Sequence, residues 1–170
     1  MPTQCDVKVE SKGWYDLGSV FAKFYINDEM LFSGSNGFNV ASVSTAGGSC
    51  ALSVVASGLN MYVDASSASV ALVSAINSIA VGDIILVSVR DTGSGIQSNA
   101  IASLQSMGAL AGSWGYRQSY TLIASKDSVN SGSCLCETLP ASAILTCVTS
   151  LYVEGSAGQF IRVPIYIYAA

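Results

Sequence analysis

The sequence of 170 residues contains no histidine. Histidine is the base in Ser-His-Asp and Cys-His catalysis, a common ligand of protein-bound zinc, and the side chain that titrates near neutral pH. The sequence therefore excludes both types of catalysis, histidine-ligated metal sites and an imidazole pH switch.

Charged residues are also scarce, at 11% of the chain against about 25% in an ordinary soluble domain. Seven lysines and arginines stand against eleven acidic residues, which gives a net charge of −4. The basic residues are scattered, so no basic surface is available to neutralise phosphates, and we expect neither a nucleic-acid partner nor membrane insertion. Because 51% of the residues are hydrophobic, the chain has enough apolar material for a core.

No targeting segment is apparent. Met1–Glu10 carries charges where a signal peptide needs an apolar run, and the longest nearly apolar stretch, Ala143–Val153, is too short to span a bilayer. The sequence also has no Asn-x-Ser/Thr glycosylation sequon. We therefore expect synthesis in the cytoplasm without a signal peptide.

The cysteines number five, which leaves an odd one in any disulfide scheme: Cys5, Cys50, Cys134, Cys136 and Cys147. Without a signal peptide, this count predicts reduced thiols that are buried as small apolar side chains. On a strand, Cys134 and Cys136 would share one face, which is poor geometry for a mutual disulfide. With Cys147 they could supply three metal ligands, but no fourth is evident, so we expect no metal and no cofactor.

Hydrophobic periodicity predicts a mixed α and β chain. Apolar residues three and four apart predict helices over residues 67–79 and from Ile101 to Met107. Ser66, Ser67 and Ser69 offer oxygens to cap the first helix. Strands are expected within residues 7–26 and over residues 38–43, 51–56, 84–89, 120–124, 143–153 and 160–168. The run Ile84–Val89 suits a strand buried on both faces, and Pro164 makes the last strand an edge strand.

Two catalytic patterns fail. Gly93–Gly95 follows a strand as a phosphate-binding loop does, but Ser98 occupies the place of the third glycine, so a plain strand–turn–helix connection fits better. Glycoside hydrolysis needs two facing carboxylates, and sequence spacing pairs none of the candidates. These candidates are Asp16, Asp28, Glu29, Asp64, Asp83 and Asp91. We therefore expect no catalytic residues and no enzymatic activity.

Asp91 follows a buried strand, and Arg117 and Trp114 precede the next one. A carboxylate and a guanidinium can hold sugar hydroxyls while an aromatic ring covers the apolar face of the sugar. A structural ion pair that fastens two loops is the alternative.

Several segments, in their order and spacing, resemble the interleukin-like EMT inducer or PANDER-like domain, also called the GG domain. They are Ser11–Trp14, Phe21–Ile26, Asn27–Phe32, Ser35–Val40, Val81–Asp91, Ser103–Gly108 and Tyr116–Lys126. The resemblance implies an α+β fold, a compact two-sheet β-sandwich flanked by short helices over residues 1–128. Residues 129–170 would form a β-rich C-terminal extension and a candidate assembly segment.

The resemblance also implies function, because one relative binds glycans through an Arg, an Asp and a second Arg. By motif these fall on Asn36, Asp91 and Arg117, with an amide at the first position. We therefore expect a non-catalytic surface module that binds glycans weakly and through many copies, with Asp91, Arg117, Asn36 and Trp114 as ligand-binding residues.

A structural virion role is the alternative. Residues 159–168 are similar to the terminal strands of phage virion proteins, and an apolar edge strand invites pairing with another subunit. The chain would then be a capsid decoration, head fibre or tail component that assembles with other virion subunits through its C-terminal strands. Both alternatives predict a homo-oligomer on a virion or other extracellular surface.

Overall fold

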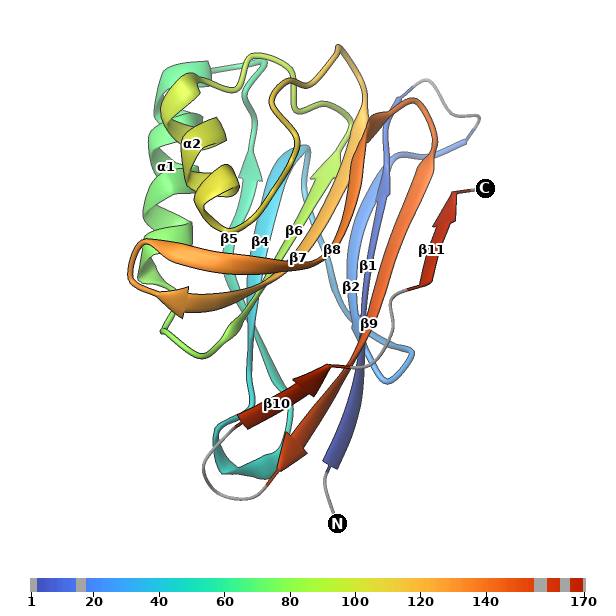
Figure 1. The fold of residues 1–170 in the computed structure, drawn as a ribbon. Helices are drawn as coiled ribbons and strands as arrows, with labels where there is room; N and C mark the ends of the chain where they lie inside the picture. The colour runs from blue at the N-terminus through green and yellow to red at the C-terminus, as the bar shows by residue number, and fades with distance from the viewer. Residues whose placement is uncertain (1–2, 15–17, 155–158, 163–165, 170) are drawn as a thin grey trace.

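The computed structural model describes residues 3–14, 18–154, 159–162 and 166–169 (Figure 1). These residues form eleven strands, two α-helices and one short 3₁₀ helix. In chain order the elements are β1 (Thr3–Lys12), β2 (Phe21–Ile26), β3 (Glu29–Ser33), β4 (Gly37–Ser44), η1 (Ala46–Gly48), β5 (Ala51–Leu59), α1 (Ala65–Ser78), β6 (Ile84–Arg90), α2 (Ser98–Ser106), β7 (Ser119–Ser128), β8 (Ser131–Ala141), β9 (Ile144–Glu154), β10 (Gln159–Arg162) and β11 (Tyr166–Ala169).

Two antiparallel sheets pack face to face. One has the order β10-β9-β1-β2-β3, with β11 also paired to β9, and the other has the order β5-β4-β6-β7-β8. Both helices cover the outer face of the five-stranded sheet (Figure 1). The expected α+β sandwich with flanking helices is therefore confirmed. Within the described residues, no helix is long and apolar enough to cross a bilayer.

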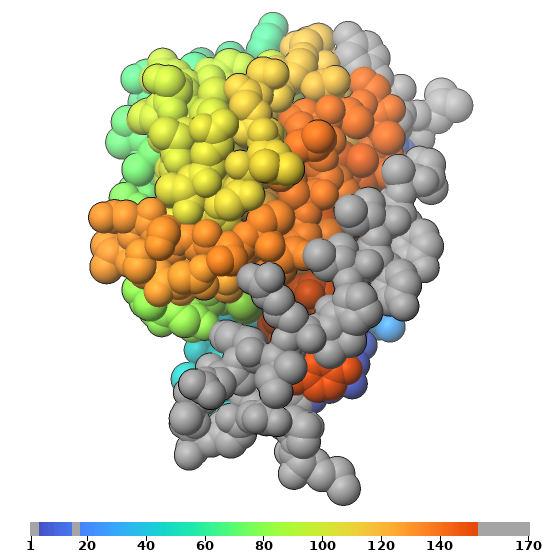
Figure 2. All heavy atoms as spheres, viewed as in Figure 1, coloured from blue at the N-terminus to red at the C-terminus, as the bar shows by residue number. Residues whose placement is uncertain are grey.

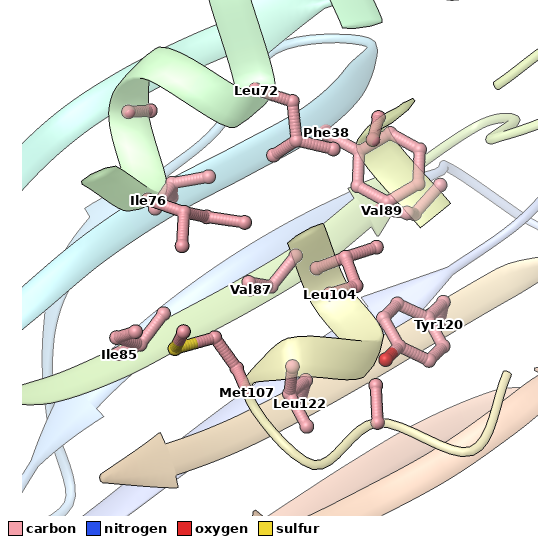
Figure 3. Packing of buried hydrophobic residues seen from close by; sticks show 14 of the residues in the cluster. Phe38, Leu72, Ile76, Ile85, Val87, Val89, Leu104, Met107, Tyr120 and Leu122 are labelled. Carbon is pink, nitrogen blue, oxygen red and sulfur yellow. The ribbon is translucent and has the colours of Figure 1, made fainter. Parts of the chain in front are cut away.

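The five-stranded sheet is buried on both faces, which gives the protein two cores. Between the sheets, Phe24 of β2 and Leu86 of β6 belong to one cluster. On the opposite face, Leu72 and Ile76 of α1 belong to a second cluster together with Val87 of β6 (Figure 3). The residues of β6 from Ile84 to Val89 are all buried, so the prediction of a strand covered on both faces is confirmed.

The expected helices are present, but the first begins differently. The side chain of Asp64 caps α1 by accepting a hydrogen bond from the backbone N–H of Ser67 at 3.0 Å, so the prediction of a serine cap is wrong. Aspartate caps as well as serine does, and Asp64 stands at the residue just before the first turn. The same hydrogen bond lowers the pKa of the Asp64 carboxyl.

The prediction of reduced thiols is wrong for four of the five cysteines. Disulfides join Cys5 to Cys50 and Cys136 to Cys147. Each joins the two sheets, since Cys5 and Cys147 lie on the six-stranded sheet, Cys136 lies on β8 of the other, and Cys50 directly precedes β5. Sheet packing brings these positions together, and no sequence pattern shows that packing. The suggested set of three metal ligands is excluded, because two of its members are bonded to each other.

Cys134 and Cys136 do not share a face, contrary to the expectation. Ile123 pairs with Cys136 while the next residue, Ala124, pairs with Cys134, so Leu135 is an extra residue in β8. This β-bulge turns Cys134 toward the helix-side core and Cys136 toward the core between the sheets.

The C-terminal residues complete both sheets. β8 pairs with β7 in the five-stranded sheet, and β9 pairs with β1 over ten residues in the other sheet. The sequence predicted neither β8 nor the earlier strand β3. The hairpin of β7 and β8 lies against α2 on the surface (Figure 2). The expected last strand is two short strands, β10 and β11, both on the outer edge of β9. Pro164 lies outside the described residues.

Candidate functional site

Several chain segments meet at one end of the sandwich. β1 ends there at Lys12, β6 ends at Arg90, and β7 begins at Ser119. The antiparallel register also brings the start of β4 to this end, since Gly37 pairs with Arg90. A bridge between Gly13 and Asp91 joins the loop after β1 to the end of β6.

Asp91 and Arg117, distant in sequence, form an ion pair at this end. Arg117 Nη1 lies 3.4 Å from Asp91 Oδ1, and the two side chains are 25% and 17% exposed respectively. The structure therefore brings together the two charged residues that the sequence proposed as a site, at a place that solvent reaches. The net charge of the pair is zero.

The backbone of both residues is held in an unusual conformation. Asp91 has φ 69° and Arg117 has φ 59°, in the left-handed region that residues with a side chain seldom adopt. The backbone N–H of Arg117 donates to Thr92 Oγ1 at 3.0 Å, which fixes one loop against the other. Two loops thus hold the carboxylate and the guanidinium in a defined arrangement.

Gly13 makes this arrangement sterically possible. A Cβ at position 13 would collide with the carbonyl oxygen of Arg117, so only glycine allows the two backbones to come this close. The next residue, Trp14, is thereby placed beside Arg117.

Exposed aromatic rings surround the guanidinium. Arg117 Cζ lies 4.5 Å from the ring centroid of Trp14 and 4.9 Å from that of Tyr116. Tyr62, from the loop between β5 and α1, lies 5.8 Å from Tyr116, centroid to centroid. Trp14, Tyr62 and Tyr116 are 59%, 67% and 44% exposed. We call Asp91, Arg117, Trp14, Tyr116 and Tyr62 the rim site.

Trp114 is placed elsewhere. Its side chain is 6% exposed and packs edge-on against Phe38 and Tyr120 in the helix-side core. In this position the ring stabilises the core beneath the rim site, and its faces are not open to a ligand. An aromatic residue close to an arginine in sequence does not reveal whether its ring points inward or outward.

Asn36 lies on the same end, in the exposed loop between β3 and β4. Arg90 Nη1 donates to the carbonyl oxygen of Gly34 at 2.8 Å, which ties this loop to the strand that carries Asp91. The contacts of the described residues do not include one between the Asn36 side chain and Asp91 or Arg117. We therefore do not include Asn36 in the rim site, although it lies at the same end of the sandwich.

Glu137 of β8 anchors the segment that leads to Arg117. Its carboxylate accepts from the backbone N–H groups of Leu110 and Ala111, at 2.8 and 3.1 Å, and from the hydroxyl of Tyr120 at 2.8 Å. Sequence reasoning missed Glu137, Trp14 and Tyr62. Trp14 belongs to the Ser11–Trp14 segment of the family resemblance, which was the one available signal.

An open depression of about 320 Å³ lies between the end of β5 and the start of α1. Val63, the residue after Tyr62, lines it together with Leu59, Asp64 and Ala68. No group of three or more metal-ligating side chains is found among the residues that the structure describes.

The fold is a two-sheet sandwich with helices on one face, and loops at one end of this scaffold hold a group of polar and aromatic side chains. The family model of the interleukin-like EMT inducer matches residues 36–128. The match covers more than half of the chain, which therefore belongs to this family, as its motifs indicated. No curated protein sequence matches the chain.

Proposed function

We propose that the chain is a non-catalytic module that binds glycans at the rim site. The observation that carries the proposal is the Asp91–Arg117 pair, which is partly exposed and lies beside the exposed ring of Trp14. Within the rim site, Trp14 and Tyr116 replace Trp114 as the aromatic residues that would contact the sugar.

The chemistry of these groups suits a sugar. The Asp91 carboxylate accepts hydrogen bonds from hydroxyl groups, and the Arg117 guanidinium donates them. The apolar face of a pyranose ring packs on an exposed aromatic ring, as Trp14 or Tyr116 offers. Because the two charges of the pair cancel, the rim site has no net charge that a ligand would need to match. A neutral glycan therefore suits it.

The affinity of one copy is expected to be weak. The rim site offers two charged groups and a few ring faces, and the chain gains useful affinity through several copies on one surface. The two disulfides are consistent with function at an extracellular or virion surface, since disulfides persist in oxidising surroundings.

The experiment is a glycan array probed with the full chain displayed multivalently, followed by calorimetric titration of the best ligand. We expect Asp91→Asn and Trp14→Ala each to weaken binding by about ten- to hundredfold, because each removes one contact and leaves the fold in place. Lys8→Ala is the matched control. Lys8 forms an ion pair with Asp28, with Nζ 3.6 Å from Oδ1, and this pair is not part of the rim site.

Three outcomes would contradict the proposal. The wild-type chain could bind no glycan, Asp91→Asn and Trp14→Ala could bind as the wild type does, or Lys8→Ala could weaken binding equally. If Asp91→Ala and Arg117→Ala both unfold the protein and the wild type binds no glycan, the pair is a structural ion pair.

The structural virion role, with assembly through the C-terminal strands, stays a prediction. β10 and β11 form the outer edge beside β9, which is where such pairing would begin.

A further inference from the structure

The outer strand β5 is an unusual sheet edge. Among the described residues only β4 pairs with it, so one side of β5 has no strand partner. β5 is nine residues long and contains no charged residue and no proline. Natural proteins commonly protect long edge strands with charges, prolines or covering segments, because unpaired backbone groups attract other strands.

The remaining edges carry such protection. β3 is five residues long and begins at Glu29, and β8 contains Glu137 and Pro140 and has three breaks in its register. β10 and β11 are four residues each. β5 has register breaks only toward its Leu59 end, while Ala51–Val54 pairs without interruption.

The chain on either side of β5 in the sequence is also nearly free of charge. Between Glu29 and Asp83 the sequence contains a single charged residue, Asp64, and this stretch forms β4, β5 and α1. Copies of a chain with net charge −4 repel each other through their other surfaces. β4, β5 and α1 contribute no charged side chain to such repulsion at the β5 edge. Val54 on β5 is 45% exposed, so apolar area there is available for burial.

We propose that β5 pairs antiparallel with β5 of a second copy of the chain, through Ala51–Val54. Pairing a strand with itself about a two-fold axis is a closed arrangement, so it gives a dimer and not a fibre. The two five-stranded sheets then form one continuous sheet, with Val54 of each copy beside Ala51 of the other. Because Asp64 follows the Leu59 end of β5, the two Asp64 carboxylates lie at opposite ends of the interface. This dimer does not depend on glycan binding.

The test is sedimentation velocity of the full chain from micromolar to millimolar concentration. We expect a reversible dimer, and we expect Val54→Lys to raise its dissociation constant on the order of a hundredfold, since it places a charge in the paired edge. Leu31→Lys is the matched control, because Leu31 lies on the edge strand β3 and is also 45% exposed. Circular dichroism melting checks that both variants fold.

Hydrogen exchange of the wild-type chain provides a second measurement that needs no variant. Amide exchange within Ala51–Val54 should slow as the concentration rises, while exchange in β3 stays unchanged. A wild-type chain that is monomeric throughout, a Val54→Lys variant that dimerises normally, or a Leu31→Lys variant that disrupts the dimer equally would overturn the proposal.

Discussion

Among the residues that the structure describes, four with side chains adopt a left-handed backbone, and two of them are Asp91 and Arg117. The other two, Asn27 and Asp28, form the turn between β2 and β3, where such angles are expected. Holding a residue in this region costs about 1–3 kcal/mol, and such strain concentrates at binding and catalytic sites. At the residue scale, the strain coincides with the two charged groups of the rim site, which supports their proposed role.

Lys126 is buried and serves the fold. Its Nζ donates to the carbonyl oxygens of Ile76, Asn77 and Ile79, at 2.8, 2.8 and 2.6 Å, and so satisfies the C-terminal end of α1 from β7. Burial lowers the pKa of the Lys126 amine.

We predict that Lys126→Met lowers the free energy of unfolding by about 3 kcal/mol, because it leaves these buried carbonyl oxygens without their donor. Urea denaturation measures the change. Lys23→Met, on the partly exposed strand β2, is the comparison and should cost much less. Equal stability of wild type and Lys126→Met would contradict this account of the helix end.

Tyr120 makes the free energy of unfolding depend on pH in the alkaline range. Burial and the neighbouring Glu137 carboxylate raise the pKa of its phenol well above the usual 10.0. Above pH 10 the phenol of the unfolded chain releases its proton while that of the folded chain keeps it, so the folded state binds more protons and stability falls as pH rises.

Tyr120→Phe should remove the part of this fall in stability that the Tyr120 phenol causes, which is about 1.4 kcal/mol per pH unit above pH 10. Near neutral pH it should cost about 1–2 kcal/mol, since the hydrogen bond to Glu137 is lost. Urea unfolding at several alkaline pH values measures both effects. Tyr25, whose phenol also has a raised pKa through burial and Glu10, still titrates in the variant. Parallel stability curves for wild type and Tyr120→Phe would refute the assignment.

At the scale of elements, the two disulfides hold the sheets together over loops of different length. The sequence separation is 45 residues for Cys5–Cys50 and 11 for Cys136–Cys147. A longer loop loses more unfolded-state entropy when it is closed.

We therefore predict that the Cys5→Ala, Cys50→Ala double variant loses about 4 kcal/mol of stability and the Cys136→Ala, Cys147→Ala variant about 3 kcal/mol. Each variant is the control for the other, because both disulfides connect the two sheets. Guanidinium denaturation under oxidising conditions measures which double variant loses more free energy of unfolding. A larger loss for the Cys136→Ala, Cys147→Ala variant would show that packing around the cysteines outweighs loop entropy.

Strong periodicity made some elements predictable from sequence. The spacing of Leu72, Ala75, Ile76 and Ile79 indicated α1, and the unbroken run in β6 indicated its burial on both faces. β8 was missed because Pro140 and a β-bulge interrupt any regular alternation. The disulfides and the burial of Trp114 depend on which strands face each other, and such long-range contacts leave no local pattern.

At the scale of the whole molecule, parts of the chain that are distant in sequence come together to form the two surfaces on which the proposals depend. The rim site joins Trp14, Tyr62, Asp91 and Arg117 at one end, while β5 and α1 form an uncharged side. In the proposed dimer the antiparallel pairing of β5 places the two rim sites at opposite ends, because β5 ends near the rim through the loop that carries Tyr62. A ligand-bearing surface would then contact one rim site of each dimer.

The most direct test of glycan binding at the rim uses the two tryptophans of the sequence. Trp14 is 59% exposed beside Arg117, and Trp114 is 6% exposed in the core, so their indole N–H resonances report on two different places. On titration with the glycan selected by the array, we predict that the Trp14 resonance shifts in proportion to occupancy and the Trp114 resonance stays in place. A shift of Trp114 alone, or no shift of Trp14 at saturation, would contradict binding at the rim site.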